Sequence, residues 1–187
     1  SAAITCVKPS GTVSQLVDSA SGIHPRFAPY YIRRVRGDDK DPLSRFLADC
    51  GVPTEPDVLT SGTVVHSFPI KAPAGAITAE SMGALEQLKL WKIYADHWCE
   101  HKPSQTIYYT DDDFLGVCEW LWENFDEASG LSFLPLEKPA YAQLPLEEIT
   151  EEEYHKLASE MPEIDWEAFK AYELEDATTG SQELACT

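Results

Sequence analysis

The sequence predicts an α/β fold, because runs that favour strands alternate with helical patterns along most of its 187 residues. Short runs rich in β-branched and aromatic residues, at 30–36 and 63–70, are typical of strands. Longer segments whose apolar residues recur every three or four positions, above all 79–100, are typical of amphipathic helices. This alternation indicates β-α-β units around a mainly parallel sheet or barrel.

The first seventy residues contain five expected elements. They are a short buried strand over 2–8, a helix over 12–20, a strand over 30–36, a helix over 42–50 and a strand over 63–70. The first helix has Val13, Leu16 and Val17 on one face, and a Ser-Gly pair ends it. Gly51 closes the second helix, a role that glycine commonly has.

The remaining sequence contains six expected elements. They are a helix over 79–100, a strand over 104–109, a helix over 112–125, a strand over 131–134 and helices over 150–160 and 165–173. Thr78 is the expected N-cap of the long helix, and Pro103 stops it. The apolar stripe of that helix comprises Leu85, Leu88, Trp91, Ala95 and Trp98. Thr150 and Glu153 form a capping box, and from Glu175 the polar chain is expected to be a loose tail.

The apolar content suits a packed core but not a membrane span. Hydrophobic residues make up 43% of the chain, yet the longest apolar runs, such as 63–68, are far too short to cross a bilayer. No positively charged start followed by an apolar stretch marks a secretory signal. We therefore expect a cytoplasmic setting and no membrane partner.

The charge is strongly acidic and unevenly distributed. A formal net charge of −18 disfavours nucleic-acid binding, since phosphate backbones require a basic surface. Residues 1–40 nevertheless hold six Lys or Arg against three Asp, so the excess negative charge lies after them. Two interpretations follow: the basic segment holds a small anion, or its arginines pair with carboxylates. Charge alone favours pairing.

The cysteines are Cys6, Cys50, Cys99, Cys118 and Cys186. Their odd number and wide spacing argue against a disulfide framework and against a Cys-x-x-Cys zinc site. The first four lie in apolar stretches and are expected to be reduced and buried. Cys186 differs, because it lies in the polar tail.

A phosphate-type turn is expected where the first strand meets the first helix. Backbone N–H groups at a helix start lack intrahelical partners and favour an anion. Gly11 would let a ligand approach the backbone closely, and Ser10, Thr12 and Ser14 add hydroxyl donors. The spacing is not that of a Walker loop, and serines and threonines at helix starts are also ordinary caps.

A second motif indicates a different chemistry. His97, Glu100 and His101 fit the His-x-x-Glu-His pattern, in which two histidines on one helical face bind zinc in a hydrolase. Pro103 ends the helix soon after the second histidine, and the sequence singles out no third ligand. We therefore expect no metal site here. His24, in a Gly-Ile-His-Pro turn, is expected to be structural rather than to face a substrate.

Several segments closely resemble the adenosylcobalamin-dependent, class II ribonucleotide reductases, and the triphosphate-reducing branch most of all. They are CVKPSGTVSQL at 6–16, SGIHPR at 21–26, YYIRRVR at 30–36, PSQT at 103–106, SGLSFLP at 129–135 and GSQELACT at 180–187. The resemblance covers essentially the whole chain, and the first block and the tail are its most specific parts. It implies the C-terminal strand–helix units of the ten-stranded reductase α/β barrel, followed by helices and a flexible tail. The implied division is barrel over 1–145, helical segment over 146–174 and the start of a redox tail over 175–187.

The resemblance also implies an activity, the reduction of ribonucleotides to 2′-deoxyribonucleotides by a thiyl-radical mechanism with adenosylcobalamin as cofactor. In that family the proline-serine turn binds the phosphates of the substrate, here a ribonucleoside triphosphate. That role falls on Ser10, Gly11, Thr12, Val13 and Ser14. The cofactor carries the radical chemistry, and the protein positions it.

The sequence departs from the related iron-dependent reductases at two places: the first favours a triphosphate substrate, and the second supports the cobalamin class. Those enzymes carry an acidic residue where Gly11 stands, and a neutral glycine tolerates the extra charge of a triphosphate better. They also relay the radical through a tyrosine pair, which would fall near Leu134 and Pro135. Neither position is a tyrosine here.

The tail and the missing parts complete the expectation. By resemblance, Cys186 is the first of two tail cysteines that re-reduce the active site by thiol–disulfide exchange with a thioredoxin-type reductant. The second cysteine and the loop with the radical cysteine are not in the sequence, and that loop belongs upstream of Ser1. The chain is then expected to need an N-terminal part and to be inactive alone. The alternative is a non-catalytic fragment that binds nucleotide or complements another chain.

Overall fold

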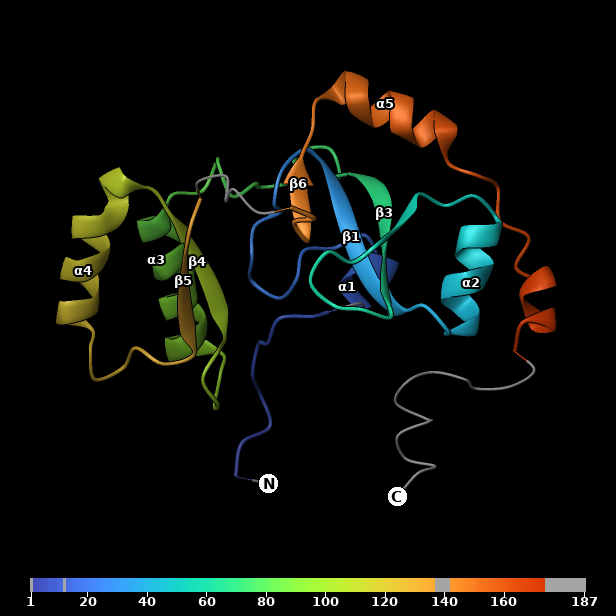
Figure 1. Ribbon diagram of the computed structural model, residues 1–187. Coiled ribbons are helices and arrows are strands. Elements are labelled where there is room, and N and C mark those ends of the chain that lie inside the picture. Colours follow the sequence, from blue (N-terminus) through green and yellow to red (C-terminus); the bar gives the residue numbers. More distant parts are fainter. Residues whose placement is uncertain (1, 12, 137–141, 174–187) are drawn as a thin grey trace. The chain divides into compact units, whose positions relative to one another are not determined.

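The computed structural model describes residues 2–11, 13–136 and 142–173 of the chain. The chain forms two compact units, shown as ribbons in Figure 1. One comprises Ser1–Pro29 and Ala72–Pro139, and the other comprises Tyr30–Lys71 and Ala140–Thr187. The second unit is thus partly inserted into the sequence of the first, and each is described separately.

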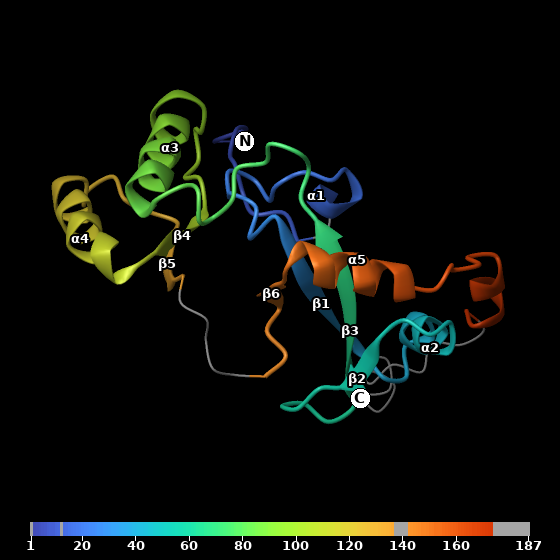
Figure 2. The ribbon, with the colours of Figure 1, turned by 90° about the horizontal axis from the view of Figure 1, so that it is seen from above.

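The second unit is built on a four-stranded antiparallel sheet. In spatial order its strands are β2 (Thr54–Pro56), β3 (Thr63–Lys71), β1 (Tyr30–Asp38) and β6 (Leu146–Glu148). The two nine-residue strands pair along their whole length, from Tyr30 opposite Lys71 to Asp38 opposite Thr63. Helix α5 (Glu151–Glu160) contacts both long strands, and Figure 2 shows it lying across them. Its start has the expected capping box between Thr150 and Glu153.

Helix α2 (Pro42–Asp49) anchors the C-terminal segment of the second unit. Asp41 caps the helix by accepting a hydrogen bond from the Leu43 amide at 2.7 Å. Phe46 is buried, and the rings of Trp166, Phe169 and Tyr172 surround it at centroid distances of 5.8, 5.2 and 5.2 Å. The last two rings belong to or adjoin the short 3₁₀ helix η2 (Ala168–Ala171). Aromatic packing therefore holds a segment that has little regular structure of its own.

The first unit contains a parallel strand–helix–strand motif. Strand β4 (Gln105–Tyr109) is followed by the 3₁₀ turn η1 (Asp111–Asp113), helix α4 (Phe114–Glu123) and strand β5 (Leu131–Pro135), which pairs in parallel with β4. Helix α3 (Ala84–His97) precedes the motif. The core consists of Ala84, Leu88, Ile107 and Val117, with Trp120 and Leu121 packed against it.

A buried glutamine ties α3 to the strand. The Gln87 side chain is fully buried, and its Nε2 donates to the carbonyl oxygens of Met82 at 2.9 Å and Tyr108 at 3.1 Å. Its Oε1 accepts from the Tyr108 amide at 3.2 Å. The side chain therefore pairs with both backbone groups of Tyr108, as a neighbouring strand would. An apolar residue at this position could not replace those bonds.

The expected α/β class is confirmed, but the expectation of a mainly parallel sheet is wrong. All three pairings of the larger sheet are antiparallel, and the described strands pair in parallel only between β4 and β5. Alternation of strands and helices does not specify the direction in which the chain returns. Between β1 and β3 the helix has only eight residues, and β2 then pairs with β3 from the other side.

Two elements expected at the N-terminus are wrong. Residues 2–8 form no strand, and their backbone bonds are isolated contacts, such as His101 N to Thr5 O at 3.1 Å and Ser104 N to Val7 O at 3.0 Å. The helix expected over 12–20 shortens to α1 (Val13–Leu16), because the backbone turns left-handed at Asp18, with φ of 49°. The face formed by Val13, Leu16 and Val17 is consequently exposed.

Other expected bounds also change. The long helix begins at Ala84 instead of residue 79, because the Ala79 amide donates to Arg26 O at 2.7 Å and Thr78 forms a local turn with Ser81. Thr78 is therefore not the N-cap, and Gly83 occupies that position. Of the helix expected over 165–173, only η2 forms. The division into 1–145, 146–174 and 175–187 stays a prediction, since compactness does not identify which residues belong to a catalytic barrel.

Candidate functional site

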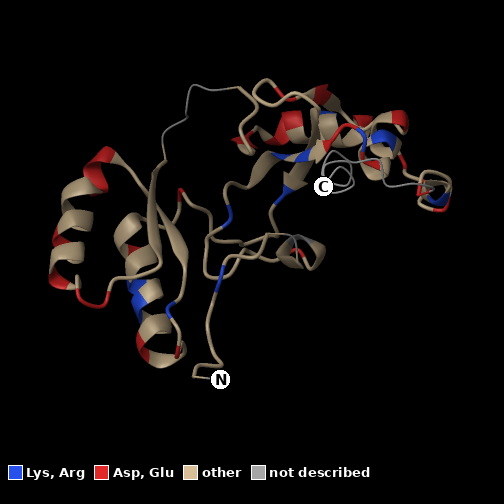
Figure 3. Cartoon of the chain, turned by 60° about the horizontal axis from the view of Figure 1, so that its bottom comes forward, with Lys and Arg blue, Asp and Glu red and all other residues tan. Residues whose placement is uncertain are grey.

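Three of the six basic residues in the first forty positions pair with carboxylates, the arrangement that the charge pattern favoured. Arg34 reaches Glu147 at 2.6 Å, Arg36 reaches Asp57 at 3.5 Å, and Arg26 reaches Asp18 at 2.8 Å. Figure 3 shows the mixture of acidic and basic residues around the sheet of the second unit. These three arginines hold the fold together, and an anion site has to come from the turn.

The turn after Pro9 is fixed by two serines. The Ser21 hydroxyl accepts a hydrogen bond from the Ser10 amide at 2.7 Å and donates one to the Ser10 carbonyl at 2.9 Å. The Ser10 hydroxyl in turn accepts from the Ser14 amide at 2.9 Å, and so provides a partner for one of the amides in the first turn of α1. Both backbone groups of Ser10 are therefore held by a residue eleven positions later.

Open space lies beside the middle of the turn. A Cβ atom placed on Gly11 would meet no other atom within 4 Å. A ligand could therefore approach the backbone at this position, which is what the sequence predicted for Gly11. Thr12 lies outside the described residues, and the side chain of Val13 is exposed. Since α1 has only four residues, its dipole adds little, and the turn's own donors must account for any anion binding.

Gly22 fits the returning chain against the start of the turn. Its φ is +60°, a backbone conformation that residues with a side chain rarely adopt, and an added Cβ would lie 2.8 Å from the carbonyl oxygen of Lys8. Lys8 itself extends to the carbonyl oxygen of Lys102 at 3.0 Å and to the Ser104 hydroxyl at 2.8 Å. The turn, the returning chain and the segment before β4 are thus held together.

His24 joins the same returning chain to β4. Its Nε2 lies 2.8 Å from the Thr106 amide, and its Nδ1 lies 2.7 Å from the Ser21 carbonyl oxygen. An amide can only donate, so Nε2 accepts and Nδ1 carries the proton that Ser21 accepts. Burial lowers the pKa of His24 below its ordinary value of 6.5, which the hydrogen bond to Ser21 only partly opposes. Both ring nitrogens are engaged, which confirms the structural role expected of this histidine.

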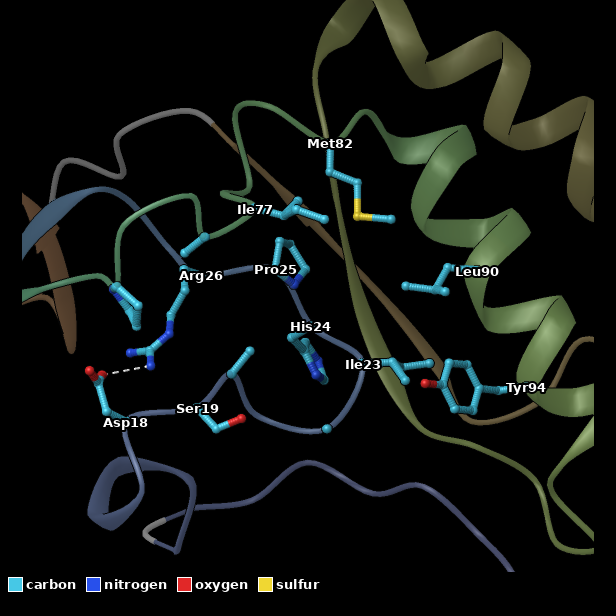
Figure 4. Close-up of a pocket in the computed structure, with 14 residues that line it drawn as sticks. Asp18, Ser19, Ile23, His24, Pro25, Arg26, Ile77, Met82, Leu90 and Tyr94 are labelled. Carbon is cyan, nitrogen blue, oxygen red and sulfur yellow. Dashed lines mark hydrogen bonds and ion pairs between the residues drawn. The ribbon is translucent and has the colours of Figure 1, made fainter.

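His24 also lines a cavity of about 420 Å³, whose lining is shown in Figure 4. Apolar side chains dominate it, among them Ile77, Met82, Leu90 and Tyr94. Its charged groups, Arg26 and Asp18, pair with each other. The cavity therefore offers apolar contact more than a free charge.

The zinc motif is not assembled. His97 is the last residue of α3, so His101 lies beyond the helix and the two imidazoles do not share a helical face. Glu100 accepts a hydrogen bond from the Ile4 amide at 2.8 Å. Within the described residues, no three His, Cys, Asp or Glu side chains lie close enough together to hold a metal ion.

Other sequence expectations concern the cysteines and β5. Cys6 and Cys118 are exposed, and Cys50 and Cys99 are only half-buried, so the expectation that these four cysteines are buried is wrong. For Cys118 the reason is that α4 turns it away from the core. Cys186 lies outside the described residues. On β5, Leu134 and Pro135 lie opposite Tyr108 and Tyr109 of β4. The sequence does not show that two tyrosines lie beside these positions.

Several known proteins are similar to the chain over most of its length. No protein-family model matches the chain. The adenosylcobalamin-dependent ribonucleoside-triphosphate reductase of Lactobacillus gasseri is 34% identical over 157 residues, which is 81% of this chain and 21% of that protein. The enzyme of the same name from Lactobacillus leichmannii is 34% identical over 162 residues, 84% of this chain and 22% of that protein. A probable enzyme of this kind from Dictyostelium discoideum is 31% identical over 175 residues, which is 91% of this chain and 23% of that protein.

A solved structure agrees. The crystal structure of a B12-dependent, class II ribonucleotide reductase matches with a TM-score of 0.74 at 32% identity, over 89% of this chain and 24% of that one. Over most of its length, the chain is thus similar to a part of the adenosylcobalamin-dependent, class II ribonucleotide reductases. It spans about a fifth of the length of the curated reductases that it matches, 21–23%. The resemblance stated from the sequence motifs is therefore confirmed for the family.

None of the helices in the described part of the chain has both the length and the apolar content that a membrane crossing needs.

Proposed function

We propose that this chain supplies the substrate-phosphate turn of an adenosylcobalamin-dependent ribonucleoside-triphosphate reductase. The observation that carries the proposal is the identity of 31–34% to enzymes of that name over 81–91% of the chain. The turn Ser10–Ser14 supports it, since Ser21 fixes the backbone of Ser10 and open space adjoins Gly11. A turn that is already fixed loses little conformational entropy when an anion binds, so the anion binds more tightly.

In the reaction, the ribose 2′-hydroxyl is replaced by hydrogen and leaves as water, while a pair of thiols is oxidised to a disulfide. Adenosylcobalamin, when bound, supplies the radical that starts this chemistry. The turn would hold the substrate's phosphates, so that the ribose stays at a fixed distance from the radical cysteine on another part of the protein. The motif β4–α4–β5 would be part of the reductase barrel, with helices and tail after it.

The redox partners belong to the same proposal. Cys186 would pass reducing equivalents from a thioredoxin-type reductant to the active-site thiols. Because exchange of this kind requires thiols that are kept reduced, a cytoplasmic setting suits it. The radical cysteine and the active-site dithiol would come from polypeptide beyond this chain.

The proposal is tested on the complete reductase polypeptide that contains this chain. Deoxyribonucleotide formation from a ribonucleoside triphosphate is measured with a dithiol reductant, with and without adenosylcobalamin. The proposal predicts product only with the cofactor. A folded, complete protein that binds ribonucleotide but forms no product under either condition would favour the non-catalytic, nucleotide-binding alternative.

A further inference from the structure

Helix α4 is apolar on two opposite faces, although the core of the first unit covers only one of them. Val117, Trp120 and Leu121 face inward, and the Trp120 ring packs against Trp91 at a centroid distance of 6.1 Å. On the opposite face lie Leu115, Cys118 and Trp122, spaced as i, i+3 and i+7, and Phe125 follows just after the helix. We call these four residues the outer stripe of α4.

The outer stripe is open to solvent to an unusual degree for its chemistry. Leu115, Trp122 and Phe125 are 78%, 86% and 77% exposed, and Cys118 is exposed as well. Single exposed apolar residues are common, but a continuous stripe that ends in two aromatic side chains marks an interaction surface.

The acidic residues beside the outer stripe indicate which kind of surface could cover it. Glu119, Glu123 and Asp126 follow one side of the stripe at helical spacing, and Figure 3 shows acidic residues along α4. A covering surface should therefore be apolar in the centre and carry Lys or Arg where it meets this edge. A second copy of this chain fits poorly, because each copy has a net charge of −18 and would bring like charges together.

We propose that the outer stripe of α4 is covered by reductase polypeptide that lies outside this chain. The curated relatives contain enough additional polypeptide to cover the stripe, since 77–79% of their length lies outside the segment aligned with this chain. The inference rests on the proposed place of this chain within a complete reductase. It assigns α4 a role as a two-sided helix that joins the strand–helix unit to the remainder of the enzyme.

Cys118 is a built-in probe of this contact. In the complete reductase polypeptide, the alkylation rate of Cys118 by iodoacetamide is followed by mass spectrometry of its peptide, in native protein and in urea. Covering predicts that native Cys118 reacts at least about tenfold more slowly than in the unfolded protein. A native rate equal to the unfolded rate would overturn the inference.

Variants separate covering from other causes of protection. Trp122→Glu, which places a charge in the stripe, should restore most of the reactivity of Cys118, whereas Glu123→Gln at the edge should change it much less. If Trp122→Glu does not fold, the native rate of the unaltered protein still decides. Protection that appears only as protein concentration and dimer content rise, by sedimentation, would assign the stripe to a second copy and overturn the proposal. If the complete protein forms product with adenosylcobalamin but its native Cys118 reacts as fast as in urea, this inference is wrong and the proposed function is supported.

Discussion

The Ser21 hydroxyl binds both backbone groups of Ser10, accepting from its amide at 2.7 Å and donating to its carbonyl at 2.9 Å. One side chain thus holds the proposed phosphate turn from a position eleven residues later. The hydroxyl can do this because it is both a donor and an acceptor. Alanine at position 21 would remove the partner of the Ser10 amide and would leave the Ser10 carbonyl with only the longer bond from the Ser14 hydroxyl, at 3.4 Å.

Ser21→Ala should therefore loosen the turn and lower the free energy of unfolding. Two hydrogen bonds to a half-buried backbone are worth about 1–3 kcal/mol together. In the complete reductase, the KM for a ribonucleoside triphosphate should rise more than kcat falls, since the chemical step lies elsewhere. Ser19→Ala is the matched control, because the Ser19 side chain is exposed. Equal KM values in the two variants would contradict the role given to Ser21.

Gly22→Ala should cost more than the same change at a glycine with a similar backbone conformation. Gly22 has φ of +60°, and an added Cβ would lie 2.8 Å from the carbonyl oxygen of Lys8. Gly75 has a similar φ of +77°, but an added Cβ there would meet no other atom within 4 Å. Gly75→Ala should then cost only about 1 kcal/mol of strain, and Gly22→Ala about 1–3 kcal/mol more because of the clash. Urea unfolding of both variants measures the difference. Similar losses would mean that the returning chain shifts freely at Gly22.

His24 should make stability depend on pH. Burial lowers its pKa in the folded protein below 6.5, so the unfolded chain binds more protons between the two pKa values. Its stabilising contribution is present above 6.5 and is lost as pH falls through the folded pKa. Protonation would also place an N–H group against the Thr106 amide, which needs an acceptor.

The pH dependence is measured as urea midpoints at about pH 7.5 and about pH 5. The drop between them should be smaller in His24→Gln, since glutamine does not titrate and still offers one donor and one acceptor. His66 will leave a residual drop, because burial lowers its pKa too. An identical drop in His24→Gln and the unaltered chain would exclude His24 as a source.

Gln87→Leu should be among the most destabilising single changes in α3. The shape is similar, but the amide and carbonyl of Tyr108 each lose a partner inside the core. Leaving them unsatisfied costs about 2–4 kcal/mol. Glu86→Ala, on the exposed side of the same helix, should stay within about 0.5 kcal/mol. Chemical unfolding of both variants, followed by tryptophan fluorescence, tests the contrast.

These relationships show which part of the fold the sequence could predict. Two local signals were reliable, whereas the expected cap at Thr78 was wrong: the capping box of Thr150 and Glu153 starts α5, and Gly51, with φ of +91°, follows α2 as expected. The long strands were also recognisable from β-branched and aromatic content. The resemblance to the class II reductases followed from the motifs, with Ser10 and Gly11 in the most specific one.

What the sequence could not provide depends on residues far apart in the chain. No periodicity indicates that Ser21 would bind Ser10, or that Gln87 would pair with Tyr108 across 21 residues. The antiparallel pairing of β1 with β3 and the early end of α1 at Leu16 also arise from the surrounding chain. Val13 and Leu16 lie on one face as the pattern required, yet that face is exposed, because packing and not periodicity decides burial.

The central claim is that the turn at Gly11 faces the substrate's phosphates, and one measurement tests it most directly. Gly11→Glu and Gly11→Gln add side chains of nearly equal size to the same open space, but only glutamate adds a negative charge. In the complete reductase with adenosylcobalamin, kcat/KM for a ribonucleoside triphosphate should fall about tenfold or more further in Gly11→Glu than in Gly11→Gln, mostly through KM. The gap should narrow as salt rises, since screening weakens the repulsion. Equal values for the two variants, at low and at high salt, would contradict the claim that phosphates lie beside this turn.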